Sequence, residues 1–139
     1  MVHSKFKEAE IDLSLIKAIS GSGQQHGTVY LNKNFYKALK NLNSTKNLKE
    51  QLENVFSRET APIWMDSSTT RQCEEIRKSI GGKKNTIELT GSDTFERFSG
   101  PQIRKFYQEN PESYEKTKII HLVSSFMASI LLGDNAPID

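Results

Sequence analysis

Four short runs of apolar and β-branched residues have the length and composition of buried strands. They occupy residues 13–19, 28–31, 62–65 and 119–123. Runs of four to eight such residues bounded by turn formers are typical of strands that are covered on both faces. Gly21 and Gly23 follow the first run and Gly27 precedes the second. We therefore expect the first two strands to be neighbours and the last run to be a central strand.

Apolar residues at helical spacing predict helices between these runs. Residues 48–56 place apolar side chains at i, i+4, i+7 and i+8, a stripe that would cover one face of a sheet. Residues 66–68 supply N-cap chemistry for a second helix, in which Asp66 is the expected cap and Gly81 the expected stop after Ile80. The order of strand, turn and helix in this region is typical of an α/β protein.

The second half of the chain predicts two further helices. One begins at Gly100-Pro101 and ends at Asn110-Pro111, and the other extends from caps at Ser124-Ser125 to Leu132, where Gly133 stops it. A half-turn is expected at residues 112–116, and the polar, Asn/Lys-rich residues 40–49 are expected to form a surface loop. The predicted class is α/β.

The charge balance excludes several classes of function. The 139 residues carry a net charge of +2, with charges scattered along the chain, so no basic stripe exists for nucleic-acid phosphates. The three histidines, His3, His26 and His121, lack the short spacings of zinc sites, and no metal site is expected. We expect His121, in an apolar run, to be packed in the core.

The chain has no segment that predicts membrane insertion or export. Its longest apolar stretch, residues 126–132, falls far short of the roughly 20 residues needed to span a bilayer. The amino-terminal residues do not resemble a secretion signal. A single cysteine, Cys73, excludes an intramolecular disulfide and fits a reducing cytoplasm.

Residues 21–27 form a glycine-rich loop that is the first functional candidate. Gly21, Gly23 and Gly27 permit close approach of a ligand to the backbone, and Gln24-Gln25-His26 lies among them. The spacing is not that of a dinucleotide-binding loop, and no Gly-Lys-Ser/Thr of a phosphate loop occurs. A tight hairpin turn is the alternative interpretation.

Trp64, Asp66 and Arg97 are further candidates. Asp66 follows a predicted strand, at the end of a sheet where ligands of α/β proteins bind, although it could serve only as a helix cap. Arg97 lies between Phe95 and Phe98, which suggests that its planar donor fork is partly enclosed and could hold hydroxyls or phosphate. A solvated surface charge is the alternative for Arg97.

Three motifs occur in order along the chain: Gly21-Ser22-Gly23-Gln24-Gln25-His26-Gly27, then Pro62-Ile63-Trp64-Met65-Asp66-Ser67-Ser68-Thr69-Thr70, then Leu89-Thr90-Gly91-Ser92 with Glu96-Arg97-Phe98-Ser99-Gly100. Together they closely resemble the eukaryotic D-xylulose kinase branch of the FGGY carbohydrate kinase family. The similarity continues through Gln102-Ile103, Asn110-Pro111-Glu112 and residues 122–126, and covers nearly the whole chain. Asp93 departs from the pattern, since the relatives have a basic residue there.

The resemblance implies a partial ribonuclease H-like domain of the actin and sugar kinase type, with an incomplete sheet flanked by helices. Residues 1–139 would be an internal part of the family's N-terminal domain. The family's phosphate-binding turn and catalytic aspartate would lie outside the chain, so no catalytic residue is expected here. ATP and Mg²⁺ would serve the parent enzyme from sites absent from this chain.

By resemblance, the residues of this segment would hold the sugar rather than perform phosphoryl transfer. His26 and Arg97 match positions that contact xylulose. Gln25 and Asp66 are lesser substrate-binding candidates, and Trp64 could form part of the cleft wall.

Two hypotheses compete on these grounds. The chain is either part of an ATP-dependent D-xylulose kinase, inactive alone and partnered by the remainder of the enzyme, or a non-catalytic sugar- or protein-binding product derived from one. A metabolite-binding module unrelated to kinases ranks below both. Ribulose and glycerol kinases share the implied architecture.

Overall fold

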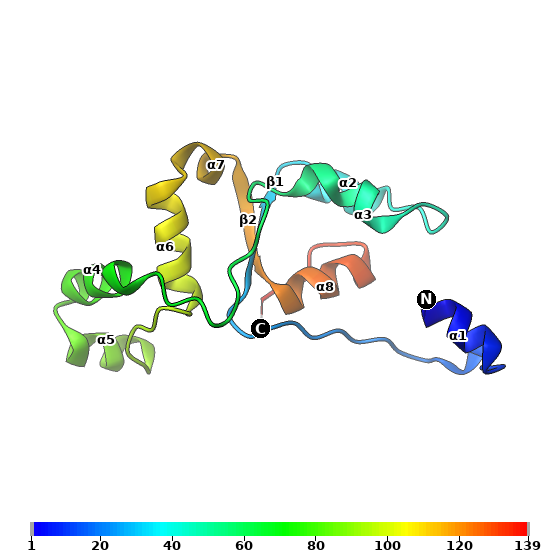
Figure 1. The fold of residues 1–139 in the computed structure, drawn as a ribbon, viewed down its shortest axis with the longest axis horizontal. Helices are drawn as coiled ribbons and strands as arrows, with labels where there is room; N and C mark the ends of the chain where they lie inside the picture. Colours follow the sequence, from blue (N-terminus) through cyan, green and yellow to red (C-terminus); the bar gives the residue numbers. More distant parts are fainter. Residues whose placement is uncertain (1, 139) are drawn as a thin grey trace.

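The computed structural model describes residues 2–138 and places a small antiparallel sheet between two groups of helices (Figure 1). The sheet consists of β1 (Thr28–Asn32) and β2 (Thr117–Leu122). In Figure 1, α4, α5, α6 and α7 lie on one side of the sheet, and α2, α3 and α8 lie on the other. This arrangement is the mixed helix and strand class that the sequence predicts.

Most of the helices lie between the two strands in the sequence. Before β2 they are α1 (Val2–Glu8), α2 (Phe35–Lys40), α3 (Leu48–Leu52), α4 (Thr70–Ile80), α5 (Lys83–Thr90), α6 (Ser99–Glu109) and α7 (Pro111–Glu115), and α8 (Val123–Leu132) follows it. Two short 3-10 turns, η1 (Leu13–Leu15) and η2 (Glu53–Val55), complete the elements. None of the helices within residues 2–138 is long and apolar enough to cross a membrane.

Alternation of side chains along β1 explains how the two groups of helices attach to the sheet. Successive strand residues point to opposite faces. Leu31 packs with Phe35, Leu39, Leu52 and Val55 in the main apolar cluster. Tyr30, its neighbour, contacts the ring of Phe106 in α6, with centroids 4.5 Å apart.

Pairing of β1 with β2 brings the glycine loop to the start of α8. Thr28 is opposite Leu122 in the register, and Asn32 is opposite Thr117, with one irregularity between Leu31 and Asn32. The N–H of Val123 donates to the carbonyl of Gly27 at 3.1 Å. The glycine loop and the first turn of α8 therefore form one corner of the molecule.

Several helices and the strand β1 agree closely with their predicted ranges. The 48–56 stripe forms α3 and η2, and the left-handed residues Gly81 and Gly133 end α4 and α8. The predicted helix after Gly100 is α6, and the predicted half-turn is α7. Residues 41–47 form most of the expected loop.

Two predicted strands are wrong. Residues 13–19 form η1 followed by an extended segment, and residues 62–65 form a turn. No strand within the described part of the chain lies beside either segment, so neither has a backbone ladder. Figure 1 shows the first of these segments running away from the sheet toward α1.

Other predictions need correction in their details. β2 pairs only with β1 within residues 2–138, so it is not the central strand expected there. The N-cap of α4 is Thr69, and the carboxylate of Asp66 instead accepts from Ser68, before the helix begins. The helices α2 and α5 were not predicted by the apolar pattern.

Candidate functional site

A hollow of about 290 Å³ lies between two of the segments with candidate residues. One wall consists of Trp64, Met65, Asp66 and Ser67, and the other of Phe95, Glu96 and Arg97. The hollow therefore combines two carboxylates, a guanidinium and two aromatic side chains. This is the donor, acceptor and apolar combination typical of a site for a small polyhydroxylated ligand.

Asp66 is held as an ionised acceptor. Its Oδ1 atom accepts from the Ser68 N–H at 2.9 Å, from the Ser68 hydroxyl, and from Nε2 of Gln102 at 2.8 Å. Partial burial raises the pKa of Asp66, but the bonds from Ser68 and Gln102 and the nearby charge of Lys105 outweigh it and keep the pKa below the ordinary range. The protein donors converge on Oδ1, which leaves Oδ2 as the acceptor for a ligand hydroxyl.

The Arg97 guanidinium lies against two aromatic rings. Its carbon is 5.8 Å from the ring centroids of both Phe95 and Phe98. Those rings contact each other edge to face at 5.3 Å. Arg97 is exposed, contrary to the expected enclosure, and no ion pair of Arg97 occurs within the described residues. Its hydrogen-bond donors remain available on a rigid aromatic support.

His26 lies beside this aromatic support rather than in the lining of the hollow. Its ring contacts Phe98, with centroids 4.7 Å apart. The backbone of His26 is left-handed, with φ 65°, and its carbonyl accepts from the Ser99 hydroxyl at 3.2 Å. These contacts fix the loop beside the residues that hold Arg97.

Gln24 connects the glycine loop to the Trp64 wall. Its Nε2 donates to the carbonyl of Pro62 at 3.3 Å, and its Oε1 accepts from the Trp64 N–H at 3.2 Å. A Cβ on Gly27 would lie 2.9 Å from the Gln24 side chain, so glycine at this position makes room for the bridging amide. Gln25, the neighbouring candidate, is exposed and does not line the hollow.

Gly23 allows the same loop to approach α8. A Cβ there would stand 2.6 Å from the Cβ of Val123 and 2.8 Å from the backbone nitrogen of Ser124. Glycine at position 23 therefore permits a close backbone contact that a plain turn would not require.

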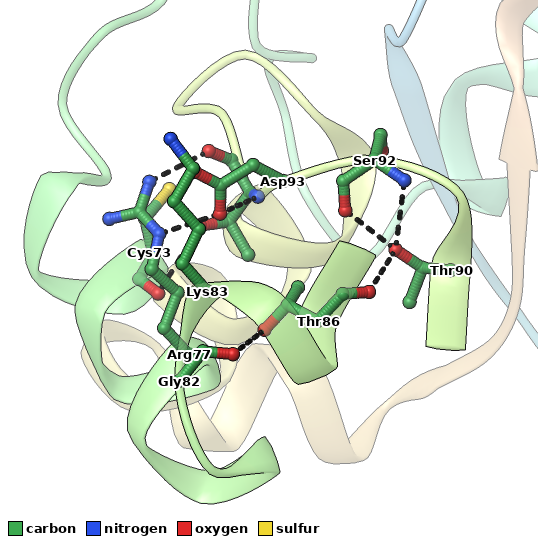
Figure 2. A network of polar contacts seen from close by, with 9 residues as sticks. Cys73, Arg77, Gly82, Lys83, Thr86, Thr90, Ser92 and Asp93 are labelled. Atoms are coloured by element: carbon green, nitrogen blue, oxygen red, sulfur yellow. Dashed lines mark hydrogen bonds and ion pairs between the residues drawn. The ribbon is translucent and has the colours of Figure 1, made fainter. Parts of the chain in front are cut away.

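A network of polar contacts lies around Asp93, shortly before the wall that contains Arg97 in the sequence (Figure 2). Asp93 accepts from Nε of Arg77 at 2.7 Å and from the Thr94 N–H at 2.8 Å, and Lys83 lies 3.5 Å away. The hydrogen bond from Arg77 lowers the pKa of Asp93, as does the charge of Lys83. Asp93 thus joins α4 and α5 to the segment that leads to Arg97, which is a structural role.

A larger hollow of about 490 Å³ lies between residues 16–21 and α8, but it lacks this chemistry. Its lining is mainly aliphatic, with Ile16, Ile19, Leu131 and Leu132. Lys17 is its one charged lining residue among those the structure describes. We therefore place the candidate site in the smaller hollow, where groups capable of recognising hydroxyls converge.

The fold is that of part of a sugar kinase. It superposes on a crystal structure of a "xyloylose kinase" from Brucella ovis with a TM-score of 0.67, over 92% of this chain and 22% of that one, at 16% sequence identity. No family model matches the sequence.

Sequence relatives agree with this class and name a particular sugar kinase. The chain is 52% identical over its whole length to "Xylulose kinase 2" of Arabidopsis thaliana and 46% identical to "Xylulose kinase" of Mus musculus. It is 50% identical over 95% of its length to "Xylulose kinase" of Schizosaccharomyces pombe. The chain is homologous to xylulose kinases, as the sequence motifs indicated, and it spans about a quarter of the length of these relatives.

The structure thus brings together part of the predicted set of site residues. Asp66, Arg97 and Trp64 line one hollow, His26 borders it through Phe98, and Gln25 stays apart. Sequence reasoning missed Gln24 and Gln102, whose amides join these segments. Gln24 was visible in the loop motif, whereas the buried role of Gln102 within a helix has no local sequence signal.

Proposed function

We propose that this chain is part of an ATP-dependent kinase that phosphorylates D-xylulose to D-xylulose 5-phosphate, and that residues 1–139 form part of an FGGY-type N-terminal domain that holds the sugar. The observation that supports this most directly is the shared hollow of Asp66 and Arg97 beside Trp64. The homology to xylulose kinases over the full chain supports the choice of sugar. We place the enzyme in the cytoplasm. Its single cysteine, Cys73, is a buried free thiol, which fits a reducing compartment.

In this proposal each side chain makes a different contact with the sugar. The Asp66 carboxylate accepts from one hydroxyl, and the Arg97 fork donates to the oxygens of others. Trp64 offers an apolar wall to the carbon–hydrogen face of the sugar. His26, on its aromatic support, donates to or accepts from a further hydroxyl, whereas Gln25 lies away from the hollow and is the weakest candidate for a sugar contact.

ATP and Mg²⁺ enter this proposal as cofactors of the parent enzyme. Within residues 2–138, no group of three histidine, cysteine or acidic side chains could hold a metal ion. We assign both cofactors to the remainder of the enzyme, which is the partner this proposal requires. ATP supplies the γ-phosphoryl group for transfer to a primary hydroxyl, and this chain contributes the position of that hydroxyl.

Kinetic assays test the proposal. The natural full-length protein that carries this sequence is incubated with Mg·ATP and D-xylulose, D-ribulose or glycerol, and ADP release is measured. We expect phosphorylation of D-xylulose in preference to the other two, and none by residues 1–139 expressed alone, because this proposal assigns the phosphate-binding turn and the base to the remainder of the enzyme. Binding of D-xylulose without turnover by the full-length protein would support the non-catalytic alternative and contradict the kinase.

A further inference from the structure

Gln102 in α6 is buried behind the candidate site, with 2% of its surface exposed. Its Nε2 donates to Oδ1 of Asp66 at 2.8 Å and to the carbonyl of Glu96 at 3.0 Å. An amide nitrogen has two hydrogens. Gln102 therefore donates one hydrogen to each wall of the hollow, and both acceptors belong to the protein.

These two bonds fix different parts of the site. The bond to Asp66 completes the set of donors on Oδ1 and leaves Oδ2 for a ligand. The bond to the Glu96 carbonyl acts one residue before Arg97, and Thr69 donates to the same carbonyl at 2.6 Å. Both acceptor positions of this carbonyl are then used, so the backbone that carries Arg97 is held firmly.

We propose that Gln102 is a positioning residue for sugar binding, whose amide nitrogen sets the separation between the Asp66 carboxylate and Arg97. Gln102 does not line the hollow, so it acts through these two residues and does not touch the sugar. The inference rests on the proposed function, because it names the residue that spaces an acceptor and a donor for neighbouring hydroxyls. The half-buried Asp66 carboxylate and the Glu96 carbonyl both lose a donor if the amide is removed.

Gln108 provides a matched control on the same helix. Its Oε1 accepts from Arg71 at 3.0 Å and from Gln72 at 2.8 Å, and its Nε2 donates to Glu75 at 2.7 Å. These bonds join α6 to α4 without reaching the hollow. Replacing either glutamine with methionine keeps the side-chain length and removes hydrogen bonds that α6 makes to neighbouring segments.

Steady-state kinetics of the natural full-length protein separate the two roles. We expect Gln102→Met to raise the KM for D-xylulose about tenfold, the usual effect of one misplaced hydrogen-bond partner, with the KM for ATP unchanged. Gln108→Met should lower the Tm without changing the KM for D-xylulose. Equal sugar kinetics in the two variants, or an equal rise in both KM values for Gln102→Met, would overturn the positioning role.

Gln102→Glu keeps the proposal testable if Gln102→Met does not fold. The new carboxylate cannot donate to Asp66 and repels it, so sugar affinity should be low at neutral pH. As the pH falls toward about 5, the new carboxyl takes up a proton and can donate again, because a neighbouring like charge raises its pKa. We expect sugar affinity of this variant, relative to the unchanged protein, to recover with falling pH, and a flat ratio would contradict the proposal.

The unchanged protein distinguishes the two possible failures. If it neither binds nor phosphorylates D-xylulose, the proposed function fails and the role of Gln102 in sugar binding fails with it. If it phosphorylates D-xylulose and the Gln102 variants behave like Gln108→Met, only the positioning role is wrong.

Discussion

The imidazole ring of His26 lies against the phenyl ring of Phe98, with centroids 4.7 Å apart and planes tilted by 44°. His26 belongs to the loop before β1, and Phe98 immediately precedes α6. Because Phe98 also supports Arg97, the contact ties two candidate sugar-binding residues from distant parts of the sequence to one aromatic ring.

His26→Ala should lower kcat/KM for D-xylulose roughly ten- to a hundredfold in the full-length protein, because a buried hydroxyl without its partner costs about 1 to 3 kcal/mol. The KM for ATP should not change. His26→Asn is the control for backbone strain, since asparagine tolerates the left-handed conformation found here. Wild-type sugar kinetics for His26→Asn would show that His26 serves the loop conformation alone.

Arg97→Ala should weaken the use of D-xylulose by a similar factor, because the aromatic support then presents no donors to the sugar. Arg97→Lys should give an intermediate loss, since it keeps the charge and loses the planar fork. The measurement varies each substrate separately. A change confined to the KM for ATP would mean that Arg97 is a surface or interdomain charge instead.

Gly23→Ala should destabilise the protein by about 1 to 3 kcal/mol, the usual cost of overpacking, because the added Cβ meets Val123 and backbone. Gly100→Ala is the matched control. Gly100 lies in the first turn of α6 with nothing within 4 Å of an added Cβ, and alanine there should stabilise by about 0.5 to 1 kcal/mol. Denaturant unfolding of both variants measures the difference, and equal stabilities would contradict the close contact.

The Arg77–Asp93 pair should make stability depend on pH in the acid range. Arg77 lowers the pKa of Asp93 in the folded state, so the stabilisation is fully present above the ordinary aspartate pKa of about 3.9 and is lost as the pH falls through the lower folded value. The stability difference between the unchanged protein and Asp93→Asn should therefore shrink below about pH 4. A constant stability difference for Asp93→Asn across this pH range would refute the linkage.

The chain expressed alone should be marginally stable or prone to aggregate. Leu15 and Ile19 are each 71% exposed and Leu132 is 69% exposed, beside the large aliphatic hollow. Exposed apolar surface and unpaired strand edges favour association. Size-exclusion chromatography and thermal melting test this, and a monomer with a cooperative transition and dispersed amide resonances would count against it.

The sequence predicted several of the elements whose packing partners lie within the chain, although it missed α2. β1, α6 and α8 form where their apolar patterns place them, and glycines end α4 and α8 as expected. Residues 13–19 have the pattern of a buried strand, but no neighbouring strand of the described chain pairs with them. Instead, Phe56 lies beside β1 and forms an isolated β-bridge with Leu31.

The candidate site shows the same limit. Motif order identified Asp66 and Arg97, and the structure places them in one hollow. The cap predicted for Asp66 was wrong because the helix begins at Thr70, with Thr69 as its N-cap. The Asp66 carboxylate also accepts from Gln102, which lies in a helix distant in sequence. Such tertiary hydrogen bonds have no signature in local spacing.

The close approach of Gly23 to Val123 also couples two positions in evolution. A Cβ at residue 23 would lie 2.6 Å from both the Cβ and the Cγ1 of Val123, so a side chain at residue 23 has space only if residue 123 is glycine. Even then the nearby backbone of Ser124 restricts what can enter. We therefore expect the order of substitutions to matter: glycine at 123 must precede any larger residue at 23, and the reverse order passes through a destabilised intermediate.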